Sequence, residues 1–246
     1  MSFVKLASNA FGAFKDNWKS VVLFSVPFLL AFPLAVLLPN YPALGGIFLR
    51  PGSLGTDVSA GGIALMLAAV AASMLLFSLA VVAINSVVKS RRTLTKLKQW
   101  DFERMETATL RMFGVYLVTF IAVFAFNLLL FQLRVAEQPR LILYALFSLA
   151  AYAAVLFAPQ AIVLDNRGIE QSIVMSSRCA AGKLAETAAF VILALVLMGV
   201  NAAVFTSLQS SLPWAIFIGV LTNSLLILPF LELLKVQIYL SKYSLL

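Results

Sequence analysis

Three asparagines lie within long apolar runs of the sequence, where a polar side chain needs a hydrogen-bond partner. They are Asn127, Asn201 and Asn223. Counted from the outer ends of the expected helices, they lie about 9, 10 and 15 Å deep, at about 1.5 Å per residue. Amides at similar depth are typical of a polar cavity for a small solute, and also of hydrogen bonds that join neighbouring helices. We favour the helix-joining role because it requires no ligand, and we keep the cavity as the alternative.

The densest charge cluster places five cations within ten residues, namely Lys89, Arg91, Arg92, Lys96 and Lys98. Such a cluster can bind the headgroups of anionic lipids, at about 1 kcal/mol per basic residue near the surface, or an acidic partner protein. It also fits a simpler role in setting membrane topology. The expected partners are therefore the lipid bilayer, with anionic lipids among its components, and a protein in a membrane complex.

Two further features could do chemistry inside an apolar run. Glu232 lies three residues before Lys235 on one helix face, and the two side chains can pair. Their position near the inner boundary favours a structural pair over a proton relay. Pro27 and Pro33 are more typical of a kink, whose freed backbone groups bond to neighbouring helices. The alternative is a broken helix of the kind that transporters use at their binding sites.

Several chemistries lack their usual residues. The chain has no histidine and a single cysteine, Cys179, which removes the common ligands of zinc, copper, haem and iron–sulfur centres. No P-loop or dinucleotide-binding glycine motif occurs, and the serines at 172, 176 and 177 lack an evident base. We therefore expect no catalytic, cofactor-binding or metal-binding residues, no cofactor, no nucleic-acid partner and no enzyme activity.

The elements that must position these residues are membrane helices. Of the 246 residues, 62% are hydrophobic and 11% are charged, whereas soluble domains contain about 45–50% and about 25%. A spanning helix needs about 20 mostly apolar residues. We expect a single integral membrane domain over residues 1–246, with spans at about 20–39, 61–88, 113–133, 141–164, 187–208 and 213–236.

The basic residues predict the orientation of these spans. Fifteen of the 18 Lys and Arg residues lie in the N-terminal tail, the second-to-third and fourth-to-fifth connections, and the C-terminal end. The other three, Arg50, Arg134 and Arg140, lie on the opposite side. Because short cytoplasmic loops are rich in Lys and Arg, we expect a multi-pass protein of the cell membrane with both termini in the cytoplasm.

Amphipathic stretches precede the first, third and fifth spans, beginning near Phe3, Leu94 and Ile169. The expected fold is thus an all-α polytopic membrane protein of six transmembrane helices, with amphipathic interfacial helices on the cytoplasmic side. The pattern is typical of a threefold repeat, each unit an interfacial helix followed by a hairpin of two spans. Convergent chemistry at the membrane surface remains the alternative.

The run from Ala158 to Arg178, with Gly182 and Lys183 after it, resembles the signature loop of a broad group of uncharacterised six-span prokaryotic membrane proteins. This group includes the membrane domain fused to some glycerophosphodiester phosphodiesterases. The matching residues are Pro159, Asp165, Ser172 and Ser176, and the ending at 236–239 resembles the last helix of the group. The resemblance implies an integral membrane module without established chemistry. The catalytic phosphodiesterase domain is absent, so its activity is not implied.

For function we expect a non-enzymatic membrane scaffold, or an accessory subunit of a larger membrane complex. The alternative is a permease or channel for a small solute, which the three asparagines and the prolines of the first span would serve.

Overall fold

The structure is a computed structural model that describes residues 2–36, 60–92 and 99–241. These residues form helices and contain no strand, which confirms the all-α expectation. The helices are α1 (Phe3–Asp16), α2 (Trp18–Val36), α3 (Ala60–Arg92), α4 (Gln99–Gln132), α5 (Glu137–Val155), α6 (Ala158–Val163), α7 (Ile169–Gly182), α8 (Leu184–Leu208), α9 (Ala215–Thr222), the π-helix η1 (Asn223–Ile227) and α10 (Leu228–Leu240).

Five segments of the described chain are long and apolar enough to cross a bilayer, as expected of a multi-pass membrane protein. They are Leu67–Lys89, Arg104–Gln132, Glu137–Val163, Leu184–Leu208 and Ala215–Leu240. The first expected span, 20–39, corresponds to α2, whose apolar part Trp18–Ala31 is shorter. Residues 37–39 of that span lie outside the described residues.

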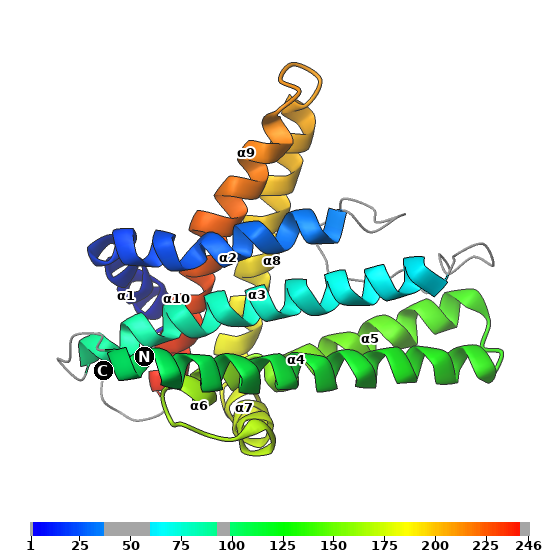
Figure 1. Cartoon of the computed structure of the whole chain (residues 1–246), viewed down its shortest axis with the longest axis horizontal. Coiled ribbons are helices and arrows are strands. Elements are labelled where there is room, and N and C mark those ends of the chain that lie inside the picture. The colour runs from blue at the N-terminus through cyan, green and yellow to red at the C-terminus, as the bar shows by residue number, and fades with distance from the viewer. Residues whose placement is uncertain (1, 37–59, 93–98, 242–246) are drawn as a thin grey trace.

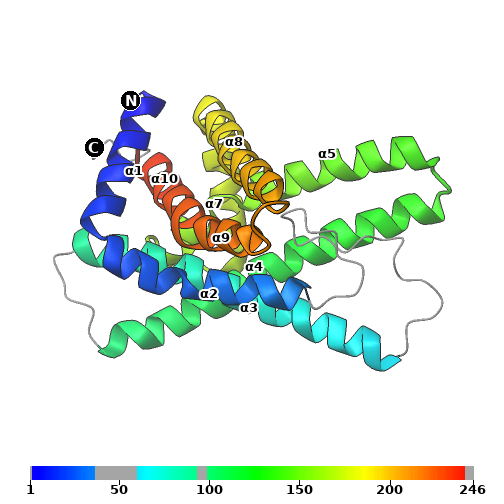
Figure 2. The same cartoon turned by 90° about the horizontal axis from the view of Figure 1, so that it is seen from above.

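The helices are arranged in two unequal parts. The long helices α2, α3, α4 and α5 pack in the order of the sequence, each against the next (Figure 1, Figure 2). The α8–α9 hairpin projects away from them (Figure 1). At its base, α10 packs against α1 and α3, and the short helix α6 packs against α3, α4 and α7. The largest cluster of buried apolar side chains, which includes Phe28, Ile84 and Tyr239, lies at this base.

Two of the three expected interfacial stretches form separate helices. In α1 the apolar face buries Leu6 and Ala10, four residues apart, and α1 lies against α10. The third stretch forms α7, between Gly168 and Lys183. The second does not form a helix of its own within the described residues, because α4 continues from Gln99 to Gln132 without a break. No glycine or proline between residues 99 and 113 marks a helix end.

Prolines accompany both interruptions inside the later spans. Pro159 lies in the first turn of α6, after α5 has ended at Val155, where a missing N–H breaks no helical hydrogen bond. Pro229 lies in the first turn of α10, directly after the π-helix. Proline cannot donate to the carbonyl four residues earlier, and the helix accommodates this with a wider turn.

Candidate functional site

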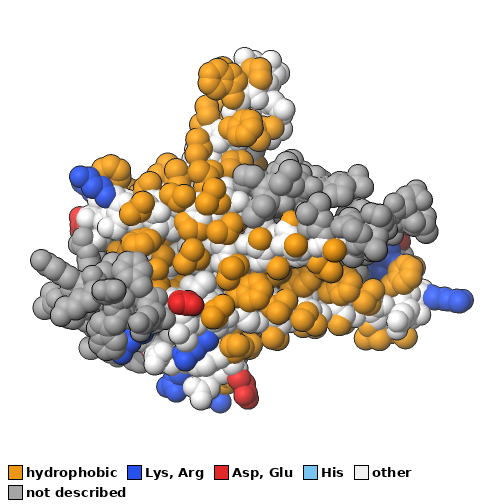
Figure 3. All heavy atoms as spheres, in the orientation of Figure 1, with side chains coloured by type: hydrophobic (Ala, Val, Ile, Leu, Met, Phe, Trp, Pro, Cys, Tyr) orange, Lys and Arg blue, Asp and Glu red, His pale blue; other side chains and the backbone are white. Residues whose placement is uncertain are grey.

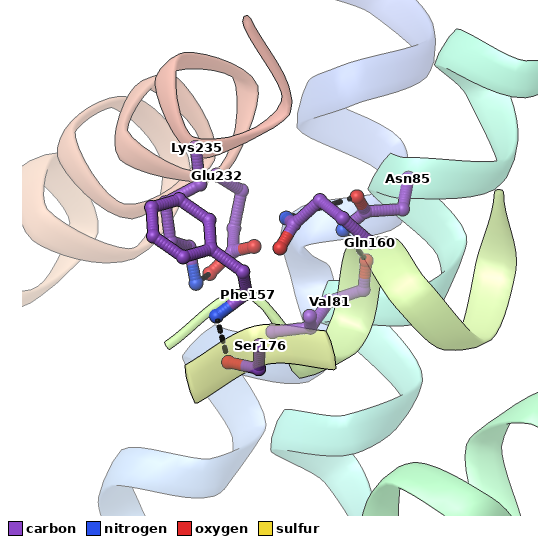
Figure 4. A network of polar contacts seen from close by, with 7 residues as sticks. All are labelled: Val81, Asn85, Phe157, Gln160, Ser176, Glu232 and Lys235. Carbon is purple, nitrogen blue, oxygen red and sulfur yellow. Dashed lines mark hydrogen bonds and ion pairs between the residues drawn. The ribbon is translucent and has the colours of Figure 1, made fainter. Parts of the chain in front are cut away.

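A cluster of buried polar side chains lies where α3, α6, α7 and α10 meet (Figure 4). We call it the polar cluster, and its members are Asn85, Gln160, Ser176, Glu232 and Lys235. All five are buried, and Asn85, Gln160 and Ser176 are completely enclosed. Polar and ionisable residues within membrane segments are costly and often mark functional sites, so this region is the candidate site.

A directional chain of hydrogen bonds fixes the two amides of the cluster. The Asn85 Nδ2 donates to the Val81 carbonyl at 2.8 Å, and the Gln160 Nε2 donates to the Asn85 Oδ1 at 3.1 Å. Because a carbonyl can only accept, the Val81 end determines which way Asn85 and then Gln160 must face. The Gln160 Oε1 is therefore left at the far end of the chain as an acceptor.

That acceptor faces a second one. The Lys235 Nζ lies 2.5 Å from the Glu232 Oε1, so the expected ion pair forms. The other oxygen, Glu232 Oε2, and the Gln160 Oε1 are both buried and have no hydrogen-bond partner among the described residues. Figure 4 shows these side chains turned toward one another. Two facing acceptors can bind one donor group between them, such as a water or an amine, which has a hydrogen for each.

Tyr116 of α4 also lies close enough to Glu232 for the two groups to interact electrostatically. Lys235 on its own helix and Tyr116 on α4 therefore both interact with the Glu232 carboxylate. This arrangement can orient a small donor group, but the described residues include no group of three His, Cys, Asp or Glu that could hold a metal ion.

The short helix α6, which carries Gln160, is capped at both ends by side chains from other helices. At its start, the Phe157 N–H donates to the Ser176 Oγ of α7 at 2.9 Å. At its end, the Lys89 Nζ of α3 donates to the Val163 carbonyl at 2.5 Å. Helix ends leave such backbone groups without intrahelical partners, and a cation suits the last carbonyls. These contacts hold Gln160 in place.

A further contact joins the loop after α6 to the last helix. The Tyr239 hydroxyl donates to the Asp165 Oδ2 at 2.6 Å. Asp165, Ser176 and Tyr239 therefore make structural contacts, Ser176 at the start of α6 and the other two between the loop after α6 and α10. Ser172 and Ser177 instead donate to carbonyls of their own helix.

The three asparagines that could line a cavity lie on three different elements of the structure. Asn201 donates its Nδ2 to the Gly219 carbonyl at 3.0 Å and so joins α8 to α9. Asn223 begins the π-helix, and its buried Oδ1 has no partner among the described residues. Asn127 is buried on α4, whose main neighbours are α3, α5, α6 and α7. A shared cavity lined by all three stays a hypothesis.

The predicted basic cluster is described only in part. Lys89 makes the capping contact with α6 given above. Arg91 and Arg92 end α3, but their side chains, and the whole of Lys96 and Lys98, lie outside the described residues. Binding of anionic lipid by this cluster remains a prediction.

Sequence reasoning missed Asn85 and Gln160. Both lie within expected spans, at 61–88 and 141–164, and they carry the same signal as the three asparagines, an amide in an apolar run. Their position near the ends of the spans, among other polar residues, concealed it. Comparison with models of known protein families finds no match for this chain, and comparisons with curated proteins and with solved structures find none either.

Proposed function

We propose that this protein is a non-enzymatic integral membrane protein that acts as a scaffold or as an accessory subunit of a larger complex in the cell membrane. The observation that carries the proposal is the exposure of the α8–α9 hairpin. Only 6% of the most apolar part of α8 is buried, against 50% for the span in α3. Figure 3 shows mostly apolar side chains over this projecting hairpin.

The exposed face of α8 suits a transmembrane helix of another subunit. Gly199, Ala203 and Ser207 follow one another at four-residue spacing and therefore share a face. Ala203 and Ser207 are exposed, and a Cβ at Gly199 would meet nothing within 4 Å. Small residues at this spacing allow two membrane helices to approach closely, which drives their association in lipid.

The proposal includes the full topology expected from the sequence. It has six spans, with α2 and the residues after it as the first, and both termini in the cytoplasm. The interfacial helix followed by two spans is proposed as a unit repeated three times, and the prolines that interrupt the fourth and sixth spans support the repetition.

The test is purification from the native membrane in mild detergent, followed by mass spectrometry of the proteins that stay bound. We expect a stoichiometric partner that the Ala203→Leu variant loses, because the larger side chain prevents close helix approach. Ala202→Leu is the matched control, since it makes the same change one residue away and about 100° around the helix. A wild-type protein that purifies alone, or equal loss in both variants, contradicts the proposal.

The polar cluster favours a second candidate function, a permease or channel for a small solute. Its two buried acceptors, Gln160 Oε1 and Glu232 Oε2, support binding of a solute with a hydrogen-bond donor. Flux of small amines and alcohols into liposomes containing the protein tests this function. Gln160→Met should abolish such flux, and Asn223→Leu should reduce it if the asparagines belong to the path. Unchanged flux in Gln160→Met excludes the polar cluster as the site.

A further inference from the structure

An open pocket lies at the other end of the α4–α5 hairpin, far along both helices from the polar cluster. Its volume is about 370 Å³, and it is lined by Phe131, Gln132, Arg134, Val135 and Arg140. The two spans Arg104–Gln132 and Glu137–Val163 end on either side of it. The pocket therefore lies at the level where these helices leave the apolar layer of the membrane.

Arg134 has a backbone conformation that arginine seldom adopts. The Arg134 N–H donates to the Phe131 carbonyl and the Val135 N–H to the Leu130 carbonyl, at 3.0 and 3.2 Å. This pattern ends a helix with a left-handed residue, usually glycine, and here Arg134 takes that place with φ of 52°. A strained residue that carries a long charged side chain at a pocket suggests that the side chain has a function.

Arg140 contributes a second guanidinium to the same pocket. Its guanidinium carbon lies 5.6 Å from the centre of the Phe131 ring, a stacking contact that holds the side chain against an apolar surface. Neither Arg134 nor Arg140 forms an ion pair with a residue that the structure describes. Two arginines at one pocket without an acidic partner provide a site for an anion.

The surroundings indicate what kind of anion fits. Phe131, Leu133, Leu141 and Ile142 next to the pocket are all more than half exposed. Such a surface suits acyl chains, while the planar guanidinium groups match the oxygens of a phosphate. Figure 3 shows positive side chains beside apolar ones at this end of the molecule.

We propose that Arg134 and Arg140 bind the phosphate of an anionic phospholipid at the tip of the α4–α5 hairpin. In the expected orientation this is the outer leaflet, where only three of the chain's 18 basic residues lie. Their presence there runs against the usual charge distribution of membrane proteins, and a lipid site accounts for it. The site is separate from both the polar cluster and the α8 face.

The test is native mass spectrometry of the full-length protein in detergent, titrated with phosphatidylglycerol and, in parallel, with phosphatidylcholine. Arg134→Gly keeps the left-handed conformation without strain, and Arg140→Gln keeps much of the side-chain length. We expect each variant to weaken phosphatidylglycerol binding about fivefold and the double variant about 30-fold. Arg178→Gln, an exposed arginine on α7, is the control for loss of one charge and should leave binding unchanged.

A competition experiment identifies the part of the ligand that is recognised. Displacement of the lipid by inorganic phosphate at millimolar concentration would show that the phosphate alone is sufficient. Resistance to phosphate would show that the acyl chains also contribute. Equal lipid binding by the wild type and the double variant, or equal affinity of the wild type for phosphatidylcholine, would overturn the proposal.

Discussion

The spans in α3 and α8 have similar apolar composition but opposite surroundings. Half of the α3 span is buried by α2, α4, α6 and α10, whereas 6% of the α8 span is buried. Buried small and polar residues of α3, such as Ser73, Ser78 and Ala80, lie against neighbours. Apolar composition therefore places a helix in the membrane, but the positions of small and polar residues determine which helices it packs against.

The comparison predicts that the packed region depends strongly on its polar contacts. Glu232→Leu should lower the free energy of unfolding by about 3–5 kcal/mol, because it leaves the Lys235 ammonium buried without its partner. Glu232→Gln should cost less, since an amide can accept from Lys235 and donate to the Gln160 Oε1. Unfolding by dodecyl sulfate in mixed micelles, followed by circular dichroism, measures both. An unchanged free energy of unfolding in Glu232→Leu would show that the cluster does not stabilise this region.

The same substitution in each region sharpens the contrast. Asn85→Leu should cost about 1–3 kcal/mol, because the buried Gln160 Nε2 loses its acceptor. Asn201→Leu removes a single bond between α8 and α9 and should cost about 0.6 kcal/mol. The micelle unfolding assay applies to both variants. A larger loss for Asn201→Leu would reverse the assignment of α3 as the packed region and α8 as the exposed one.

The smallest expected effect concerns two glycines of the hairpin. A Cβ at Gly219 would lie 2.9 Å from the Phe205 Cβ, whereas one at Gly199 would meet nothing within 4 Å. Overpacking lowers the free energy of unfolding by about 1–3 kcal/mol, and replacing a helical glycine with alanine raises it by about 1 kcal/mol. Gly219→Ala should therefore be mildly destabilising and Gly199→Ala mildly stabilising, as measured by thermal unfolding in detergent. A stabilising Gly219→Ala or a destabilising Gly199→Ala would mean that α8 and α9 do not pack as described.

Local patterns in the sequence were sufficient to predict the helical membrane fold and part of the site. Glu232 and Lys235 lie three residues apart, so their pairing follows from helix geometry. The contact between Asn85 and Gln160 joins residues 75 positions apart, and its prediction requires the packing of α6 against α3. The projection of the α8–α9 hairpin was equally beyond prediction, because the α8 sequence is as apolar as that of α3. Composition does not distinguish contact with lipid from contact with protein.

The π-helix η1 lies between α9, which belongs to the exposed hairpin, and α10, which carries part of the polar cluster. It holds one residue more per turn than an α-helix would, and each residue corresponds to about 100° of rotation about the axis. Because the wider turn takes up one extra residue, α9 and α10 keep nearly the directions that an uninterrupted α-helix would give them. Deleting Leu225 should therefore restore a regular helix and leave Glu232 and Lys235 facing Gln160. In evolutionary terms, η1 has the form of a one-residue insertion that the last span absorbs without separating the polar cluster.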